Sequence, residues 1–245
     1  MDVPERVRSP ASRLADMEQV TIGSQRGFLA LPESSGPAPG VIVLHEIFGL
    51  NDDIKANTRR LADAGYVSLA LDLYSAGNKA LCIARAITDM ARGNGPTVDR
   101  IEAARSWLVA RPEVAGSRIG VIGFCMGGAF ALAAAIHHDF AAASVNYGRV
   151  PKGAGALDGI CPVVGAYGRK DLSLRRDPAR LEAALTELGV AHDVKVYPNA
   201  GHSFLNKGAP SWLPPIPMMS AGYVPDAADD AWARILPFFD EHLRN

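Results

Sequence analysis

Continuous apolar runs alternate with helix-patterned segments along most of the chain, and this alternation constrains the fold more than any other feature. Four of the runs are VIVLHE, YVSLALDLY, RIGVIGF and CPVVGAYG. Unbroken apolar runs of this length are typical of parallel strands that are buried on both faces. Helices in the intervening segments would cover those faces. The sequence therefore predicts an α/β fold with a mostly parallel central sheet.

The elements follow in a regular order after an antiparallel hairpin, which is predicted over Val20–Leu31 with its turn at Gly-Ser. The predicted strands are 41–46, 66–74, 118–124, 141–148, 161–168 and 192–198, and the predicted helices are 51–64, 79–92, 97–110, 127–138, 177–188 and 227–242. There is no internal repeat and no linker of domain scale, so we expect one domain over residues 1–245. The sequence does not decide whether residues 1–18 are ordered or disordered.

Composition argues against several classes of protein. The chain has 25 Lys and Arg against 26 Asp and Glu, and no basic patch indicates binding to nucleic acid or to an anionic membrane. No apolar run approaches the roughly 20 residues of a membrane span, and the N-terminus lacks the apolar core of a signal peptide. The three cysteines do not form a disulfide framework. We expect a soluble, cytoplasmic protein.

Four predicted strands end close to a residue that can take part in catalysis. These residues are Glu46, Cys125, Asp171 and His202. Because ligands of open α/β sheets bind beyond the carboxyl ends of the strands, we expect the four side chains to share one site.

The segment GFCMGG places Cys125 in a G-x-C-x-G turn between a predicted strand and a predicted helix. Such a turn holds a nucleophile in a strained conformation at the start of a helix, and glycines leave room for it. The N–H groups of the helix end favour a thiolate, which is the reactive form of cysteine. The alternative is a small packing residue, and the glycine spacing favours the nucleophile. Cys82 and Cys161 lack this context and are expected to be packing residues.

His202, in the loop NAGHSF, is the histidine best placed to act as a base. The other histidines fit surface, capping or packing positions, and His45 is the hardest of them to dismiss. Asp171 completes the order nucleophile, acid, histidine that hydrolases with this turn share. Its nearest rival, Asp177, better suits a helix N-cap before Pro178.

With these residues in place, the chain resembles the dienelactone hydrolase family from about Val20 to its C-terminus. HEIFG is similar to that family's motif around a glutamate, GFCMGG to its cysteine turn and AGHSF to its histidine loop. The resemblance implies the α/β-hydrolase fold, with no cofactor. No spacing of His, Asp or Glu matches a zinc signature either, so no metal is expected.

The resemblance also implies roles for individual residues. Cys125 would be the nucleophile, His202 the base, and Asp171 the group that orients the base. Glu46 would lie beside the thiol and take part in its activation, keeping it unreactive until substrate displaces the carboxylate. From the residues alone, a solvated loop carboxylate is an equal interpretation of Glu46.

An oxyanion hole is implied at the backbone amides of Ile47 and Met126. For Met126 there is also a reason in the residues themselves, because it opens the helix that follows the cysteine.

The substrate side departs from the family pattern. Ser203 is present, but Asn206, followed by Lys207, stands where the family has an arginine that binds a substrate carboxylate. A second arginine has only Arg85 as a candidate. The further candidates for substrate contacts are Phe48, Tyr147 and Trp212. The Pro-rich and aromatic segment 206–226 is a candidate lid over an apolar pocket, with Trp212, Met218, Met219 and Tyr223 as its apolar side chains.

Three functions remain open on these observations. The first is a hydrolase of carboxylic esters or lactones that works through an acyl-enzyme. The second keeps the site but acts on thioesters or on small neutral esters. The third is a non-catalytic protein of the same fold that binds a small ligand, against which the complete set of reactive residues argues. In each case the partner is a small molecule, and the chain would be a monomer or a homodimer.

Overall fold

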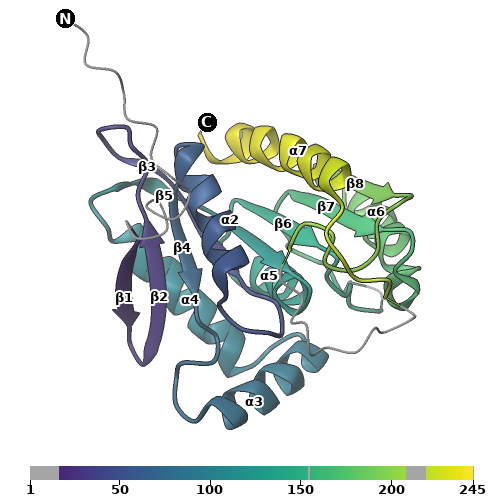
Figure 1. Cartoon of the computed structure of the whole chain (residues 1–245), viewed down its shortest axis with the longest axis horizontal. Helices are drawn as coiled ribbons and strands as arrows, with labels where there is room; N and C mark the ends of the chain where they lie inside the picture. Colours follow the sequence, from purple (N-terminus) through teal and green to yellow (C-terminus); the bar gives the residue numbers. More distant parts are fainter. Residues whose placement is uncertain (1–16, 154, 208–218, 245) are drawn as a thin grey trace, which may run out of the picture.

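Eight strands form one sheet in the computed structural model, which describes residues 17–153, 155–207 and 219–244 (Figure 1). The strands are β1 (Glu18–Ile22), β2 (Gln25–Ala30), β3 (Ala38–Leu44), β4 (Val67–Leu71), β5 (Val114–Phe124), β6 (Ala142–Asn146), β7 (Val163–Gly168) and β8 (His192–Tyr197). Their order across the sheet is β1-β2-β4-β3-β5-β6-β7-β8. The β1–β2 and β2–β4 pairs are antiparallel, and all later pairs are parallel. The predicted fold class is confirmed, including the N-terminal hairpin.

Helices cover both faces of this sheet (Figure 1). They are α2 (Asp52–Asp63), α3 (Lys79–Arg92), α4 (Pro96–Val109), α5 (Met126–His137), α6 (Asp177–Glu187) and α7 (Pro225–Leu243), with a short 3₁₀ turn, η1 (Leu172–Leu174). α2 and α7 pack on one face, whereas α4 and α5 pack on the other with α3 against them, and α6 packs on β7 and β8. The predicted helices are all present, with ends that differ by at most two residues from the predicted ones.

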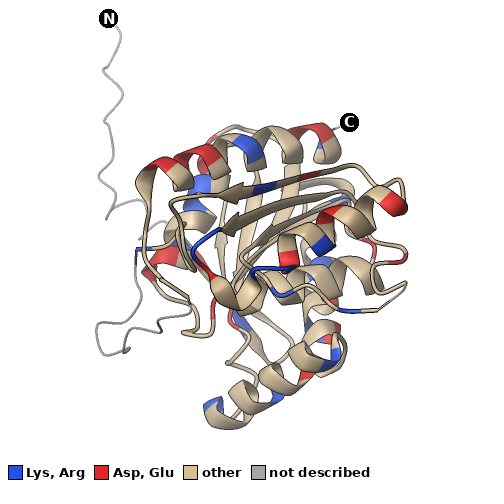
Figure 2. Ribbon diagram, turned by 90° about the vertical axis from the view of Figure 1, so that its right-hand side faces the viewer, with Lys and Arg blue, Asp and Glu red and all other residues tan. Residues whose placement is uncertain are grey.

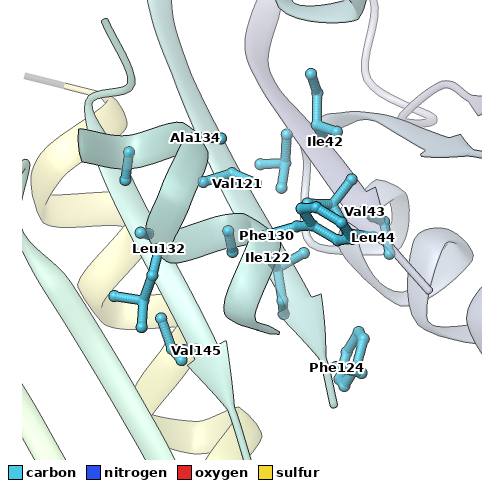
Figure 3. Close-up of a cluster of buried hydrophobic side chains, with 14 of the residues drawn as sticks. Ile42, Val43, Leu44, Val121, Ile122, Phe124, Phe130, Leu132, Ala134 and Val145 are labelled. Atoms are coloured by element: carbon cyan, nitrogen blue, oxygen red, sulfur yellow. The ribbon is translucent and has the colours of Figure 1, made fainter. Parts of the chain in front are cut away.

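The centre of the core lies between β3, β5, β6 and α5 (Figure 3). β3 and β6 are buried along their whole length, as expected for strands that are covered on both faces. Most of α5 is buried too, because every residue before its final histidine is apolar or glycine. Because α5 is packed in the core, the position of its N-terminus, where Cys125 lies, is fixed.

Several strands have ends that differ from the predicted ones, and β5 and β4 are two examples. β5 begins at Val114 instead of Arg118, because Val114 pairs with Ala38 and the Ala38 N–H donates to the carbonyl of Glu113. β4 ends at Leu71, whereas a strand to Tyr74 was predicted. There the Asp72 carboxylate accepts a hydrogen bond of 3.0 Å from the Tyr74 N–H and turns the chain.

The sheet has its topological switch point at β3. The chain runs from β3 to β4 on one side and then crosses to β5 on the other side. The loops after β3 and β5 therefore diverge, and the space between such loops is where open α/β sheets bind their ligands. The loop after β3 carries Glu46, and the one after β5 begins with Cys125.

Lys and Arg are interspersed with Asp and Glu over the elements (Figure 2). Across residues 17–153, 155–207 and 219–244, no helix has the length and apolar composition to cross a membrane. Most of the N-terminal segment 1–18 and of the candidate lid 206–226 lies outside the described residues.

Candidate active site

Four loops at the carboxyl edge of the sheet carry the reactive residues that the sequence singled out. Glu46 follows β3, Cys125 follows β5 directly, Asp171 follows β7 and His202 follows β8. Glu46, Asp171 and His202 are buried, and Cys125 is half-buried. Hydrogen bonds and electrostatic contacts link the four groups, so the structure brings them together as one cluster.

Cys125 lies in a tight turn between β5 and α5. Its φ is 54°, a backbone conformation that few residues other than glycine adopt. The neighbouring glycines make this turn sterically feasible. A Cβ on Gly123 would lie 1.9 Å from the carbonyl oxygen of Gly127, and a Cβ on Gly127 would lie 2.3 Å from that of Leu44. The turn holds the thiol at the N-cap of α5, where the helix N–H groups favour an anion.

His202 and Asp171 form a direct pair. Nδ1 of His202 lies 2.6 Å from Oδ2 of Asp171, and the other carboxylate oxygen accepts hydrogen bonds from the N–H and the hydroxyl of Ser173. Burial raises the pKa of Asp171, but the hydrogen bonds from His202 and Ser173 outweigh burial and keep this pKa below its usual value. The ionised carboxylate therefore fixes the ring with a proton on Nδ1.

The other ring nitrogen of His202 is directed to the thiol side of the cluster. This atom, Nε2, is buried and has no hydrogen-bond partner among the described residues. Burial lowers the pKa of His202, but the bond to Asp171 and the negative charge of Cys125 outweigh it and raise the pKa to about 10. The protonated form of the imidazole is thus stabilised in the cluster.

Glu46 is a buried carboxylate, not the solvated loop residue that was the alternative interpretation. Glu46 is only 1% exposed. Its Oε1 accepts a 2.7 Å hydrogen bond from the hydroxyl of Ser203. Burial raises the pKa of Glu46, and the hydrogen bond from Ser203 and the charge of His202 offset part of that rise. Glu46 is therefore a stronger base than an exposed glutamate.

Tyr147 lies against the same cluster. Its ring centroid is 5.1 Å from that of His202, and its hydroxyl is buried with no hydrogen-bond partner among the described residues. Burial raises the pKa of Tyr147 well above its usual value, and the negative charges of Glu46 and Cys125 raise it further. Tyr147 is therefore a neutral hydrogen-bond donor next to Glu46.

Asn206 is buried, at 3% exposed, and is tied to α2. Its Oδ1 accepts a 2.8 Å hydrogen bond from Nδ2 of Asn57. Its own Nδ2 acts on Glu46 and lowers the pKa of that carboxyl group. Asn206 and Ser203 therefore both contact the Glu46 side of the cluster, although the sequence placed them only on the substrate side.

Tyr74 is a residue of this site that the sequence did not reveal. Its hydroxyl donates to the carbonyl of Ile47 over 3.0 Å and lies 3.5 Å from the sulfur of Met126. It thus links the two residues whose amides were predicted to form an oxyanion hole. The sequence showed only an aromatic residue at the end of an apolar run, which gives no signal for this contact.

His45 packs against Tyr74 and bonds to the residue before it. Its Nε2 accepts from the N–H of Leu73 over 3.1 Å, and its ring packs edge-on against Tyr74. His45 is fully buried, and burial lowers its pKa. Its contacts are those of a packing residue, which was one of the two interpretations that the sequence left open.

The remaining candidates for substrate contacts are spread more widely. Phe48 is half-buried in the loop after β3. Arg85 is exposed on α3, where its charge adds to the effect of burial in lowering the pKa of Arg100. Lys207 is exposed, with its ammonium 5.0 Å from the ring centroid of Tyr223. Trp212 and Met218 lie outside the described residues.

Asp177 occupies a different position from the one predicted. It was expected to be a helix N-cap, but the N-cap is Arg176 and Asp177 is the first residue of α6. Its Oδ1 accepts from the N–H of Val150 over 2.8 Å and pairs with Arg180. Because this carboxylate satisfies a buried N–H of the loop after β6, it folds inward instead of capping its own helix.

The two other cysteines have no comparable surroundings. Cys82 is buried on α3, and both it and the half-buried Cys161 are free thiols. Burial raises the pKa of Cys161 to about 12, so this thiol does not ionise near neutral pH.

Taken as chemistry, the cluster offers a thiol at a helix N-terminus, an imidazole oriented by a carboxylate, and a second, buried carboxyl group. Such a set can form and release a covalent acyl intermediate. Within the part of the chain that the structure describes, no group of three His, Cys, Asp or Glu side chains is arranged to hold a metal ion.

Comparisons with known proteins show which family the chain resembles. The sequence model of the dienelactone hydrolase family matches residues 25–243. A protein of Yersinia pestis with the name "Putative carboxymethylenebutenolidase" is 31% identical over 91% of this chain and 88% of its own. A Saccharolobus solfataricus protein of the same name is 30% identical over 87% of this chain and 92% of its own.

Solved structures show the same likeness. A dienelactone hydrolase-like promiscuous phosphotriesterase from metagenomic libraries has a TM-score of 0.77 and 31% identity, over 92% of this chain and 97% of that one. The dienelactone hydrolase from Anabaena variabilis has a TM-score of 0.67 at 22% identity, over 93% and 97% of the two chains, which shows the shared fold.

Proposed function

Because the chain belongs to the dienelactone hydrolase family, and is thus a hydrolase of ester bonds, we propose that it cleaves carboxylic esters or lactones with Cys125 as its nucleophile. The observation that carries this proposal is the convergence of the loops after β5, β7 and β8. They place the thiol at a helix N-terminus and direct the free Nε2 of an Asp171-bound His202 toward it.

The proposed reaction begins with the thiolate of Cys125 attacking the ester carbonyl carbon. The carbonyl π-electrons move onto oxygen, and the amide N–H groups of Ile47 and Met126 stabilise the resulting oxyanion. When the tetrahedral intermediate collapses, the C–O bond to the alcohol breaks, and the alkoxide takes a proton from the protonated His202. The products of this half-reaction are a thioester on Cys125 and the free alcohol.

Water completes the cycle in the second half-reaction. His202 accepts a proton from a water molecule as that water attacks the thioester carbon. Collapse of the second tetrahedral intermediate releases the carboxylic acid and regenerates the thiolate beside the imidazolium. Asp171 stays ionised throughout, and its role is to hold the ring and to stabilise its charge.

Glu46 takes part in forming the thiolate in this proposal. Its raised pKa supports a role as an acceptor of the thiol proton, because an ordinary surface carboxylate would be too weak a base. Ser203 and Tyr147 lie next to the carboxylate and limit its movement.

The same site fits a neutral substrate, such as a small ester or a thioester, better than one that carries a carboxylate. Asn206 stands where an arginine would hold an anion, and it is buried against Asn57. The cation next to it, Lys207, is exposed over Tyr223. An amide offers no charge, and a mobile ammonium fixes only one point of a carboxylate, so neither replaces a bidentate guanidinium.

The compartment and the domain organisation belong to the same proposal. A reactive thiol is best kept in a reducing compartment, so we place the protein in the cytoplasm. The single sheet through the described residues supports one domain.

Turnover of 4-nitrophenyl acetate, followed by mass spectrometry of the intact protein, tests the proposed function. We expect hydrolysis, a transient mass increase of one acetyl group on Cys125, and complete loss of activity after alkylation of one thiol. Binding of the ester without turnover would instead support the non-catalytic alternative. Turnover that survives alkylation of Cys125 would rule out this residue as the nucleophile.

A further inference from the structure

Two buried amides connect helix α2 to the candidate active site. Nδ2 of Asn57, on α2, donates to Oδ1 of Asn206, in the loop after β8, although the two residues are 149 positions apart. Asn57 is 7% exposed and Asn206 is 3% exposed. A buried hydrogen bond between two neutral side chains is costly to leave unmade, so it holds both side chains in one orientation.

The direction of this hydrogen bond determines what Asn206 presents to its other neighbours. A carboxamide has one acceptor end and one donor end, and Asn57 occupies the acceptor end. The donor end, Nδ2, is buried without a hydrogen-bond partner among the described residues, and it acts on the carboxylate of Glu46. If the amide of Asn206 were reversed, its Oδ1 would face the carboxylate oxygens, and the two acceptors would repel each other.

The other groups around Glu46 show why one neutral donor matters there. Ser203 donates to Oε1, and Tyr147 contributes an unpaired hydroxyl. Of the charged groups that act on this carboxylate, His202 stabilises its ionised form and Asp53, from α2, opposes it. The remaining titratable groups of the cluster are Cys125, which acts on both His202 and Tyr147, and Asp171, which is bonded to His202.

We propose that Asn57 is a positioning residue, which orients the amide of Asn206 so that its NH₂ group faces the carboxylate of Glu46. Ser203 then donates to the carboxylate, and the NH₂ group of Asn206 and the hydroxyl of Tyr147 are the neutral donors near it. A residue on α2 that has no role in the chemical steps thereby sets how readily Glu46 ionises. The role of Asn57 in orienting Asn206 does not depend on the proposed function, whereas its effect on activity rests on that function.

The substitution Asn57→Asp reverses the direction of the bond. An ionised Asp has no donor, so it can only accept from Nδ2 of Asn206, and the amide must turn its Oδ1 toward Glu46. We expect the pKa of Glu46 to rise, because the ionised carboxylate loses a donor and gains an acceptor. Asn57→Ala removes the constraint without reversing it, so it should raise this pKa by a smaller amount.

Titration of Glu46 by NMR, with ¹³C-labelled glutamate and in a Cys125→Ala background, measures this effect without any turnover. We expect a rise of about 1–2 pH units in Asn57→Asp, the size of one hydrogen bond to the charged form. The matched control is Thr58→Val, since Thr58 is the next buried residue of α2 and its hydroxyl bonds within the helix to the carbonyl of Ile54. That variant should lower the melting temperature and leave the titration of Glu46 unchanged.

A double-mutant cycle separates the amide reversal from the added charge of the aspartate. In an Asn206→Leu background no amide remains to be turned, so Asn57→Asp should shift Glu46 much less than in the parent. An equal shift in both backgrounds would show that charge alone acts, and this would overturn the proposal. An unchanged pKa of Glu46 in folded Asn57→Ala and Asn57→Asp variants would overturn it too.

The pH dependence of kcat/KM is an independent measure of Glu46 ionisation, in protein that retains Cys125. If ionised Glu46 is needed, the acidic limb of kcat/KM should move to higher pH in Asn57→Asp by the same amount as the titration, whereas Thr58→Val keeps the wild-type limb. If hydrolysis proves independent of Cys125, the proposed function fails, but the NMR titration still decides the role of Asn57.

Discussion

Nδ1 of His202 and Oδ2 of Asp171 are 2.6 Å apart, although they come from loops that follow different strands. The bond leaves only Nε2 of the ring available for chemistry, and a second carboxylate, Glu46, lies beyond that ring. The two acids of the site therefore have different surroundings, because Asp171 bonds to the imidazole whereas Glu46 accepts from the hydroxyl of Ser203.

Replacement of Cys125 by alanine is expected to abolish ester hydrolysis while the fold is kept. The turn at position 125 is held by the packing of glycines around it, so a smaller side chain fits. Initial rates with 4-nitrophenyl acetate, together with circular dichroism, check this. Cys161→Ala serves as the control, because that thiol has a pKa raised to about 12 and should be dispensable. More than a small residual rate in Cys125→Ala would contradict the assignment.

Cys125→Ser is expected to be a weak enzyme at best. A serine hydroxyl needs a stronger base than a thiol does, and the raised pKa of Glu46 suits only the more acidic nucleophile. The ratio of kcat in Cys125→Ser to that in the wild type measures this, and a ratio near one would show that the thiol is not required.

His202→Ala is expected to lower kcat by about a thousandfold or more, as for removal of a triad member. Asp171→Asn should cost less, but far more than Asp177→Asn, because Asp177 binds the Val150 N–H and Arg180 instead of the imidazole. Asp177→Asn should appear mainly as a lower melting temperature. A larger loss of kcat in Asp177→Asn than in Asp171→Asn would mean that the wrong acid has been assigned.

The pKa of His202 is expected to fall when either negative neighbour is removed. Both the hydrogen bond to Asp171 and the charge of Cys125 stabilise the imidazolium, so losing one of them favours the neutral ring. Histidine NMR titrations of the wild type, Cys125→Ala and Asp171→Asn should place the wild-type value highest. His45 is an internal control, since it is buried with its own partners and its pKa is lowered.

Tyr74→Phe is expected to lower kcat roughly tenfold with little change in KM. Removal of an oxyanion donor itself costs more than this, and Tyr74 acts through the carbonyl of Ile47 and the side chain of Met126. Single-turnover rates of acylation with a neutral ester measure the effect. Tyr66→Phe is a suitable comparison, because Tyr66 bonds to Asp240 away from the site and should affect stability alone.

Neutral short-chain esters are expected to be hydrolysed with kcat/KM at least comparable to that for dienelactone. Arg at position 206 should move this ratio toward the acidic substrate by roughly tenfold, provided that Asn57→Ala makes room for the guanidinium. The matched pair is Asn57→Ala with and without Asn206→Arg, assayed on both substrates. A strong wild-type preference for dienelactone, unchanged by these substitutions, would point to Arg85 or Lys207 as the anion site.

The sequence predicted the order of elements well because each central strand is an unbroken apolar run and some helices, such as α2, have clear end signals. Asn51, which caps α2, and Gly65, which follows it with a φ of 90°, are examples. Less predictable were the contacts of polar residues between loops. The turn of Asp177 toward Val150 depends on an N–H that only the folded loop after β6 presents.

The same limit applied to the site. Cys125 and His202 stand in motifs whose local sequence forces their backbone, so their positions could be read directly. Tyr74 and Asn57 carry no such motif, because each acts through one contact with a residue far away in the sequence. Pairings of this kind depend on how α2 and the loop after β4 pack on the sheet, and no local pattern encodes that packing.

The glycine packing around position 125 has a consequence for how such sites change over evolution and in the laboratory. The backbone there is shaped by Gly123 and Gly127, whose missing side chains admit the close approach of neighbouring carbonyls. The side chain of Cys125, midway between these glycines, is not needed for that shape. The neighbouring glycines set the backbone conformation of residue 125. One mutation can therefore exchange the nucleophile while the turn that presents it is kept. Selenocysteine at this position would therefore be presented in the same orientation, on a chain that needs no redesign elsewhere.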